Sequence, residues 1–175
     1  MIIAPPVWLV SVIQWVQTST QFPEFVNANG WLWAAAETVH FMGLCLLLGT
    51  IGAFDLRLLG VAKNLPIGPI ERLIPWGVSG FVICALTGAF FVFGNHWTAN
   101  AYLANPAFQW KMLLIMLAGI NVLAFNKLKL PGRVAVLGTG SRVPLSAKVI
   151  AATSLVLWIA VIVLGRFLPI LGDAF

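Results

Sequence analysis

Glu37 and His40 lie three residues apart inside an apolar segment, residues 31–60, that is long enough to cross a membrane. Ionisable side chains are costly in hydrocarbon, so in spanning helices they are usually paired or functional. A neutral imidazole is the usual axial ligand of haem iron, and we expect His40 to be such a ligand. The alternative is a structural hydrogen bond from His40 to a neighbouring helix, worth about 0.6 kcal/mol in membranes.

The spacing Glu-x-x-His also occurs in each half of carboxylate-bridged di-iron sites. Such a site needs a second copy of the motif and further carboxylates, which this sequence does not supply. We therefore expect Glu37 to form a salt bridge or hydrogen bond with Lys111 rather than to bind a metal.

Composition places these residues in a membrane protein. The chain of 175 residues is 61% hydrophobic and 9% charged, with a mean hydropathy of +0.98, whereas soluble domains are about 25% charged. Its length suits about four spanning helices of about 20 residues each. The sequence pI of 9.8 reflects membrane topology, as the positions of the basic residues indicate. We expect a lipid bilayer around the chain and no nucleic-acid partner.

The predicted fold is an all-α membrane protein, a four-helix transmembrane bundle with an N-terminal interfacial amphipathic helix, in a single domain. Loops rich in Pro, Gly and Asn separate the apolar segments. The four spans are expected at about residues 32–59, 73–95, 108–126 and 146–168.

The N-terminal apolar run, about residues 7–17, is too short to span a bilayer in the ordinary way. Its Trp8 and Trp15 suit the headgroup level, which favours a helix that lies in the interface, with a short fifth span as the alternative. We expect a polar connection over residues 18–29 to follow it.

Basic residues indicate the orientation of the bundle. Of the ten Lys and Arg residues, all but Lys111 and Arg166 lie in or beside the two loops that follow the first and third spans. The positive-inside rule makes that face cytoplasmic, so both termini and His96 are expected to face outward. At the cytoplasmic end of the first span, Asp55 and Arg57 are expected to be a pair that sets topology.

Counting residues from the cytoplasmic end gives approximate depths, because a helix rises about 1.5 Å per residue. His40 lies about 22 Å up and Lys111 about 24 Å up, with Met112 in the same layer. Glu37 is about one turn further out, and Arg166 lies about 27 Å up. The count predicts that these side chains converge in the outer half of one bundle.

His96 does not fit this layer, because it lies about 36 Å up, roughly 13 Å further out than His40. Helix tilt, on average about 20°, could remove part of the difference. We therefore keep three interpretations of His96: an interface residue, a second axial ligand, or an exposed redox or metal contact. Met112 is the alternative second ligand.

Lys111 and Arg166 have two interpretations. They could extend to the outer interface, as long cationic side chains do near helix ends. They could also bind the propionates of a haem, because carboxylates near the water boundary favour cationic partners.

Small residues recur on the second span at Gly80, Cys84 and Gly88, and Gly43 lies one turn from His40 on the first. Residues of this size allow two helices to approach closely. The same stripe would also admit a flat macrocycle, and the two interpretations stay open.

The stretch HFMGLCLLLGTIGAFDLRLLG, residues 40–60, and the Trp110-Lys111 pair that opens the third span resemble the CopD and HemJ group of small bacterial membrane proteins. They resemble still more a set of uncharacterised bacterial four-helix domains. The resemblance covers about residues 31–126. It implies a bundle in the bacterial cytoplasmic (inner) membrane, with both termini on the periplasmic side.

HemJ-like proteins bind haem b and oxidise protoporphyrinogen, and CopD-like proteins are associated with copper uptake. By position, His40 and Lys111 match the HemJ-type histidine and lysine. The match to copper proteins is poorer, because Met42, Met112 and Met116 are scattered within helices instead of forming an outward cluster.

The leading hypothesis is a membrane protein with haem b that transfers electrons between a quinone or membrane oxidoreductase and an outward-facing partner. His40 would be the axial ligand, His96 or Met112 the second, and Lys111 and Arg166 the propionate anchors, beside Glu37. The alternatives are a HemJ-like protoporphyrinogen oxidase, CopD-like transport of copper or another small solute, and a non-catalytic subunit of a larger or self-associated assembly.

Overall fold

The computed structural model describes residues 5–61, 63–94 and 103–171, and every regular element in these ranges is an α-helix. Four helices are long and apolar enough to cross a membrane, which confirms the predicted all-α multi-pass fold. These four are α3 (Trp31–Leu59), α5 (Ile74–Phe93), α7 (Pro106–Lys127) and α9 (Leu145–Leu171). The shorter elements are α1 (Val7–Ser19), α2 (Phe22–Ala28), α4 (Ile67–Glu71) and α8 (Leu130–Ala135).

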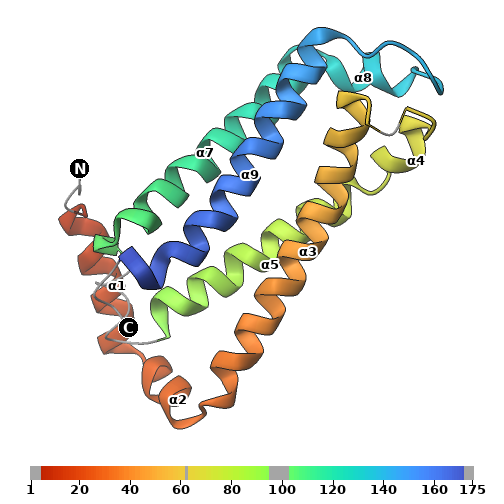
Figure 1. The fold of residues 1–175 in the computed structure, drawn as a ribbon. Helices are drawn as coiled ribbons and strands as arrows, with labels where there is room; N and C mark the ends of the chain where they lie inside the picture. Colours follow the sequence, from red (N-terminus) through yellow and green to blue (C-terminus); the bar gives the residue numbers. More distant parts are fainter. Residues whose placement is uncertain (1–4, 62, 95–102, 172–175) are drawn as a thin grey trace.

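The four long helices form two antiparallel pairs (Figure 1). Helix α3 packs along α5, α7 packs along α9, and a smaller contact between α3 and α9 joins the pairs. In Figure 1 α3 and α9 lie close together at the end that carries α4 and α8 and separate toward the end that carries α1. The basic loops lie at the first of these ends, which is named the basic end below; the other is the α1 end.

The contact between α3 and α5 depends on glycine. A Cβ atom built on Gly80 would lie 2.6 Å from the carbonyl oxygen of Gly43, and one on Gly43 would lie 2.9 Å from both the Gly80 carbonyl oxygen and Cys84 Sγ. Side chains larger than hydrogen therefore cannot fit at this crossing without moving the backbone. The stripe of small residues serves close helix approach at Gly43, Gly80 and Cys84, as the first of its two interpretations predicts.

A cluster of buried apolar side chains closes the basic end. It includes Phe54 and Leu58 of α3 and Ile67 of α4, which pack with residues of α8, α9 and the α8–α9 loop. Since α8 and α9 belong to one helix pair and α3 to the other, this cluster is the junction of the two pairs. Its buried members are Phe54, Leu58, Ile67, Leu130, Val134, Val143, Ala147 and Ala151.

Arg57 joins the two loops of the basic end. Its side chain is 1% exposed, with Nε donating to the carbonyl oxygen of Leu65 and Nη2 to that of Gly138 at 3.4 Å. The same loops are also linked by a hydrogen bond from the Gly140 amide to the Lys63 carbonyl. Arg57 thus binds loop carbonyls and forms no ion pair with Asp55 in the described chain, and the expectation that the two residues set topology stays a prediction.

Helix α1, with 13 residues, covers the α1 end of the bundle. Its buried Ile13 packs with Leu103 and with apolar residues of α5 and α7, while Trp8 and Trp15 are each 68% exposed. The helix is thus observed at about the expected residues, and its place in the membrane interface stays a prediction. The expectation that residues 18–29 form only a polar connection was wrong in part, because this range contains helix α2. A proline in the first turn of α2 and the acidic Glu24 beside it favour helix initiation.

Candidate functional site

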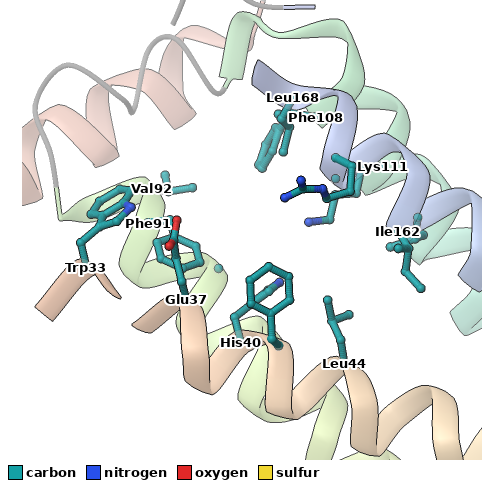
Figure 2. A pocket seen from close by; sticks show the side chains of 15 residues that line it. Trp33, Glu37, His40, Leu44, Phe91, Val92, Phe108, Lys111, Ile162 and Leu168 are labelled. Carbon is teal, nitrogen blue, oxygen red and sulfur yellow. The ribbon is translucent and has the colours of Figure 1, made fainter. Parts of the chain in front are cut away.

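A cavity of about 250 Å³ lies between the two helix pairs toward the α1 end (Figure 2). Its charged and titratable lining consists of Glu37 and His40 from α3, Lys111 from α7 and Arg166 from α9. The remaining wall is apolar or glycine. Four of the side chains that the depth count placed together therefore line one cavity, whereas Met112, which was placed in the same layer, does not.

Helix α5 fixes the orientation of the His40 ring. Nδ1 of His40 lies 2.7 Å from Oγ1 of Thr87, and that same hydroxyl lies 2.7 Å from the carbonyl oxygen of Ile83. A threonine hydroxyl has one proton, and the Ile83 carbonyl can only accept, so Thr87 donates to Ile83 and accepts from Nδ1–H. The proton of the neutral ring is thereby assigned to Nδ1 from the hydrogen-bond network.

The other ring nitrogen, Nε2, then has a lone pair. It has no hydrogen-bond partner among the described residues, and it is not one of the fully buried polar atoms that lack a partner, so it is accessible from the cavity that His40 lines. An imidazole whose Nδ1–H is held by an oxygen is the usual state of a histidine that binds a metal through Nε2. His40 is therefore prepared to bind a Lewis acid or to accept a proton or hydrogen bond.

Aromatic rings from α3 and α5 form one wall of the cavity. Phe91 packs edge-on against His40 with ring centroids 5.7 Å apart, and Trp33 lies 5.2 Å from Phe91. On the opposite side Phe108 comes from α7 (Figure 2). Rings on both sides would favour a ligand that is flat and largely apolar.

Lys111 and Arg166 provide two positive charges on the α7–α9 side. The Lys111 ammonium lies over Gly165, because a Cβ atom built on Gly165 would be 3.7 Å from Nζ. Arg166 is exposed and Lys111 half-buried. Neither forms an ion pair with an acidic side chain in the part of the chain that the structure describes. An anionic ligand would therefore meet two cations whose charges the protein does not neutralise.

The expected contact between Glu37 and Lys111 is absent from the described chain. The two side chains lie on opposite sides of the cavity, as Figure 2 shows. The physical reason is that α3 and α7 belong to different pairs, which have diverged at this depth. Depth counting placed both residues in the right layer but could not give the width of the space between them.

Met112 and His96 were the alternatives for a second ligand, and the structure does not bring Met112 to His40. Met112 lines a separate hollow with Pro5, Pro6 and Leu9 beside α1. His96 lies outside the described residues. Within the described ranges no three or more His, Cys, Asp or Glu side chains are grouped so that they could hold a metal ion.

Thr87 and Gly165 are functional candidates that sequence reasoning did not identify, whereas Gly88 belongs to the stripe that was also interpreted as admitting a flat macrocycle. Gly88 lines the cavity, and a Cβ atom built on it would meet nothing within 4 Å, so here the glycine stripe opens into the cavity instead of packing on α3. A signal for Thr87 was available: it is a hydroxyl in an apolar helix, one turn from Cys84 in the stripe that faces α3.

The fold and the cavity define a class: a multi-pass α-helical membrane protein with a cationic and aromatic cavity between two helix pairs. No protein-family model matches the chain, and neither does any curated protein or solved structure. The likeness to CopD and HemJ therefore depends on the sequence motifs alone.

Proposed function

We propose that this chain binds haem b in a bacterial cytoplasmic membrane and transfers electrons between a quinone or membrane oxidoreductase and a partner on the outer side. One observation supports this most: the Nε2 atom of His40 is available to the cavity while Thr87 holds Nδ1–H, and two cations lie on the opposite wall. An axial imidazole and two partners for two propionates are what haem b requires.

The chemical types of the cavity residues suit haem b. The cavity volume of about 250 Å³ is slightly below the range of about 300–1,000 Å³ for small-molecule sites, so one edge of a porphyrin would extend beyond the cavity. Gly88 leaves open space on α5 for a flat ring, and on the other helix pair Gly165 faces the Lys111 ammonium. Bound haem would supply one-electron chemistry at its iron, which the described side chains do not supply by themselves.

The protein's own part is to hold, orient and shield. His40 is kept in one tautomer by Thr87, and its ring packs against Phe91, which in turn packs against Trp33. Lys111 and Arg166 would bind carboxylates and so fix the direction in which the ligand lies. Apolar walls lower the local dielectric, which is one of the means by which a protein adjusts a redox potential.

Basic residues support the proposed orientation. The loops around α4 and α8 would face the cytoplasm by the positive-inside rule, which puts the cavity near the outer face. Electrons would then have only a short distance to travel between the cavity and a redox partner on the outer side. A second copy of the chain is an alternative partner.

An absorption spectrum tests the proposal. Protein purified in detergent, with haem supplied during expression or afterwards, is expected to show a Soret band that is lost in His40→Ala. Thr38→Val should leave the band intact, because the Thr38 side chain is exposed and does not line the cavity. A folded, colourless preparation that does not take up added haem would exclude the proposal, and bound copper in its place would favour the CopD-like alternative.

The same preparation addresses the remaining assignments. In His96→Ala, a shifted but persistent Soret band would identify His96 as the second axial ligand, and an unchanged band would give it another role. Turnover of protoporphyrinogen by the haem-loaded protein would favour the HemJ-like enzyme over electron transfer alone.

A further inference from the structure

Asp55 lies in the contact that joins the two helix pairs, far from the cavity. It belongs to the last two turns of α3 and is 5% exposed. Its carboxyl group hydrogen-bonds to the side chain of Ser154 on α9. Its Oδ2 atom is buried and has no hydrogen-bond partner in the described chain.

The charged groups of the surrounding elements do not neutralise this carboxyl group by an ion pair. Arg57 follows two residues later on the same helix, so it lies on another face, and its guanidinium binds the carbonyl oxygens of Leu65 and Gly138. No other charged side chain of α4, α7, α8 or α9 forms an ion pair with Asp55 within the described ranges. Those side chains are Glu71, Lys127, Lys111, Arg133, Lys148 and Arg166.

An ionised carboxylate in this place would be buried with one oxygen unpaired. The effective penalty for burying an ion is several kcal/mol, and it is recovered only when a counter-ion and further hydrogen bonds are present. A protonated carboxyl group carries no charge and so avoids most of this penalty, and the Ser154 hydroxyl, which can donate to only one of the two oxygens, does not pair Oδ2. The geometry therefore favours the neutral acid.

We propose that Asp55 is a proton-binding site, and that the bound proton holds α3 to α9 at the junction of the pairs. The contact is shielded from bulk solvent, because Asp55 is 5% exposed and Ser154 of α9 is 8% exposed. Release of the proton would put an unpaired charge into this contact and favour its opening. A proton taken up near the basic end is thus linked to how firmly the two walls of the cavity are joined.

Infrared spectroscopy of the purified full chain tests the site directly. At neutral pH the wild type is expected to show the carbonyl stretch of a protonated carboxyl group, with a shift in heavy water. The band should be lost in Asp55→Asn and kept in Glu37→Gln, which removes an exposed carboxyl group toward the other end of the same helix. Absence of the band in wild type, or its persistence in Asp55→Asn, would overturn the proposal.

A second variant keeps the test decisive if Asp55→Asn does not fold. Ser154→Ala should shift the frequency of the band without abolishing it, because it removes the hydrogen bond and leaves the proton; an unshifted band would contradict the assignment. Stability gives an independent readout. The folded chain would hold a proton that the unfolded chain has released, so the unfolding temperature of wild type should fall as pH rises, and Asp55→Asn should remove that part of the fall.

Discussion

The hydrogen bond of 2.7 Å between His40 Nδ1 and Thr87 Oγ1 connects the first and second spanning helices at the edge of the cavity. Cys84, one turn from Thr87 on α5, also donates a weak hydrogen bond to the backbone carbonyl of His40 at 3.5 Å. His40 is thus held by α5 at both its ring and its backbone. Its availability as a ligand depends on these contacts as much as on its own presence in the sequence.

Thr87→Val should weaken haem binding about 10–100-fold, the usual effect of losing the group that orients a ligating histidine. Valine keeps the shape of threonine but cannot accept from Nδ1–H, so the ring is no longer fixed in one tautomer. Titration of haem into the apoprotein measures the effect. The control is Thr38→Val, because the Thr38 hydroxyl bonds only to its own helix, at the Ala34 carbonyl. Equal affinity for both variants would contradict this role of Thr87.

Gly88→Leu should block the cavity without unfolding the chain. A Cβ atom at position 88 meets nothing within 4 Å, so the new side chain enters open space in the cavity. Gly119→Leu is the matched control, since position 119 is also unobstructed but lies away from the cavity. We expect the Soret band to be lost or greatly reduced only in Gly88→Leu, with similar unfolding temperatures for both variants. A normal band in Gly88→Leu would show that the ligand lies elsewhere.

Much of the fold could be predicted from sequence because each spanning helix is a local property. Apolar length determines the span, and Pro or Gly marks its ends, so α3 and α9 begin and end close to the residues expected. Helix α2 was missed because a seven-residue helix has no apolar periodicity to reveal it. Its signal was local: Pro23 and Glu24 in the first turn.

The candidate site could be predicted only in part because it depends on distances between helices. Helix rise placed His40 and Lys111 in one layer and Arg166 just outside it, and all three line the cavity. The rise per residue gives the depth of a side chain but not the direction in which it points from the helix axis, so it could not show that Met112 faces α1. Nor could it show that the pairs diverge, which separates Glu37 from Lys111.

Gly80→Ala should destabilise the protein by about 1–3 kcal/mol, the usual cost of overpacking. The added methyl group would lie 2.6 Å from the Gly43 carbonyl oxygen and 2.7 Å from the Leu47 amide nitrogen, both of them backbone atoms. Gly88→Ala, on the same face of the same helix, should leave stability unchanged or raise it, since alanine is the better helix former. Unfolding in mixed detergent and denaturant measures both. Equal effects would contradict the tight crossing of α3 and α5.

Arg57→Lys should destabilise the basic end despite the conserved charge. The planar guanidinium of Arg57 donates hydrogen bonds to the carbonyl oxygens of both Leu65 and Gly138, and a lysine ammonium cannot reproduce this geometry. Hydrogen bonds to charged groups contribute about 1.5–3 kcal/mol, so a loss of that order is expected in the free energy of unfolding. Arg142→Lys, at an exposed position of the α8–α9 loop, should change it by less than about 0.5 kcal/mol. A comparable small change in Arg57→Lys would exclude the role of Arg57 in holding the loops.

Lys111→Gln should reduce the preference of the protein for haem over haem dimethyl ester. The ester has the same ring and iron but no carboxylates, so only the free acid can form ion pairs with Lys111. One charge-assisted hydrogen bond contributes about 1.5–3 kcal/mol, which corresponds to a preference of about 10–150-fold in wild type. We expect that preference to shrink in Lys111→Gln, and likewise in Arg166→Gln, while affinity for the ester stays nearly the same. Lys129→Gln, exposed at the basic end, is the control. An unchanged preference in both cavity variants would mean that the two cations do not bind the propionates and would favour their simple extension to the membrane surface.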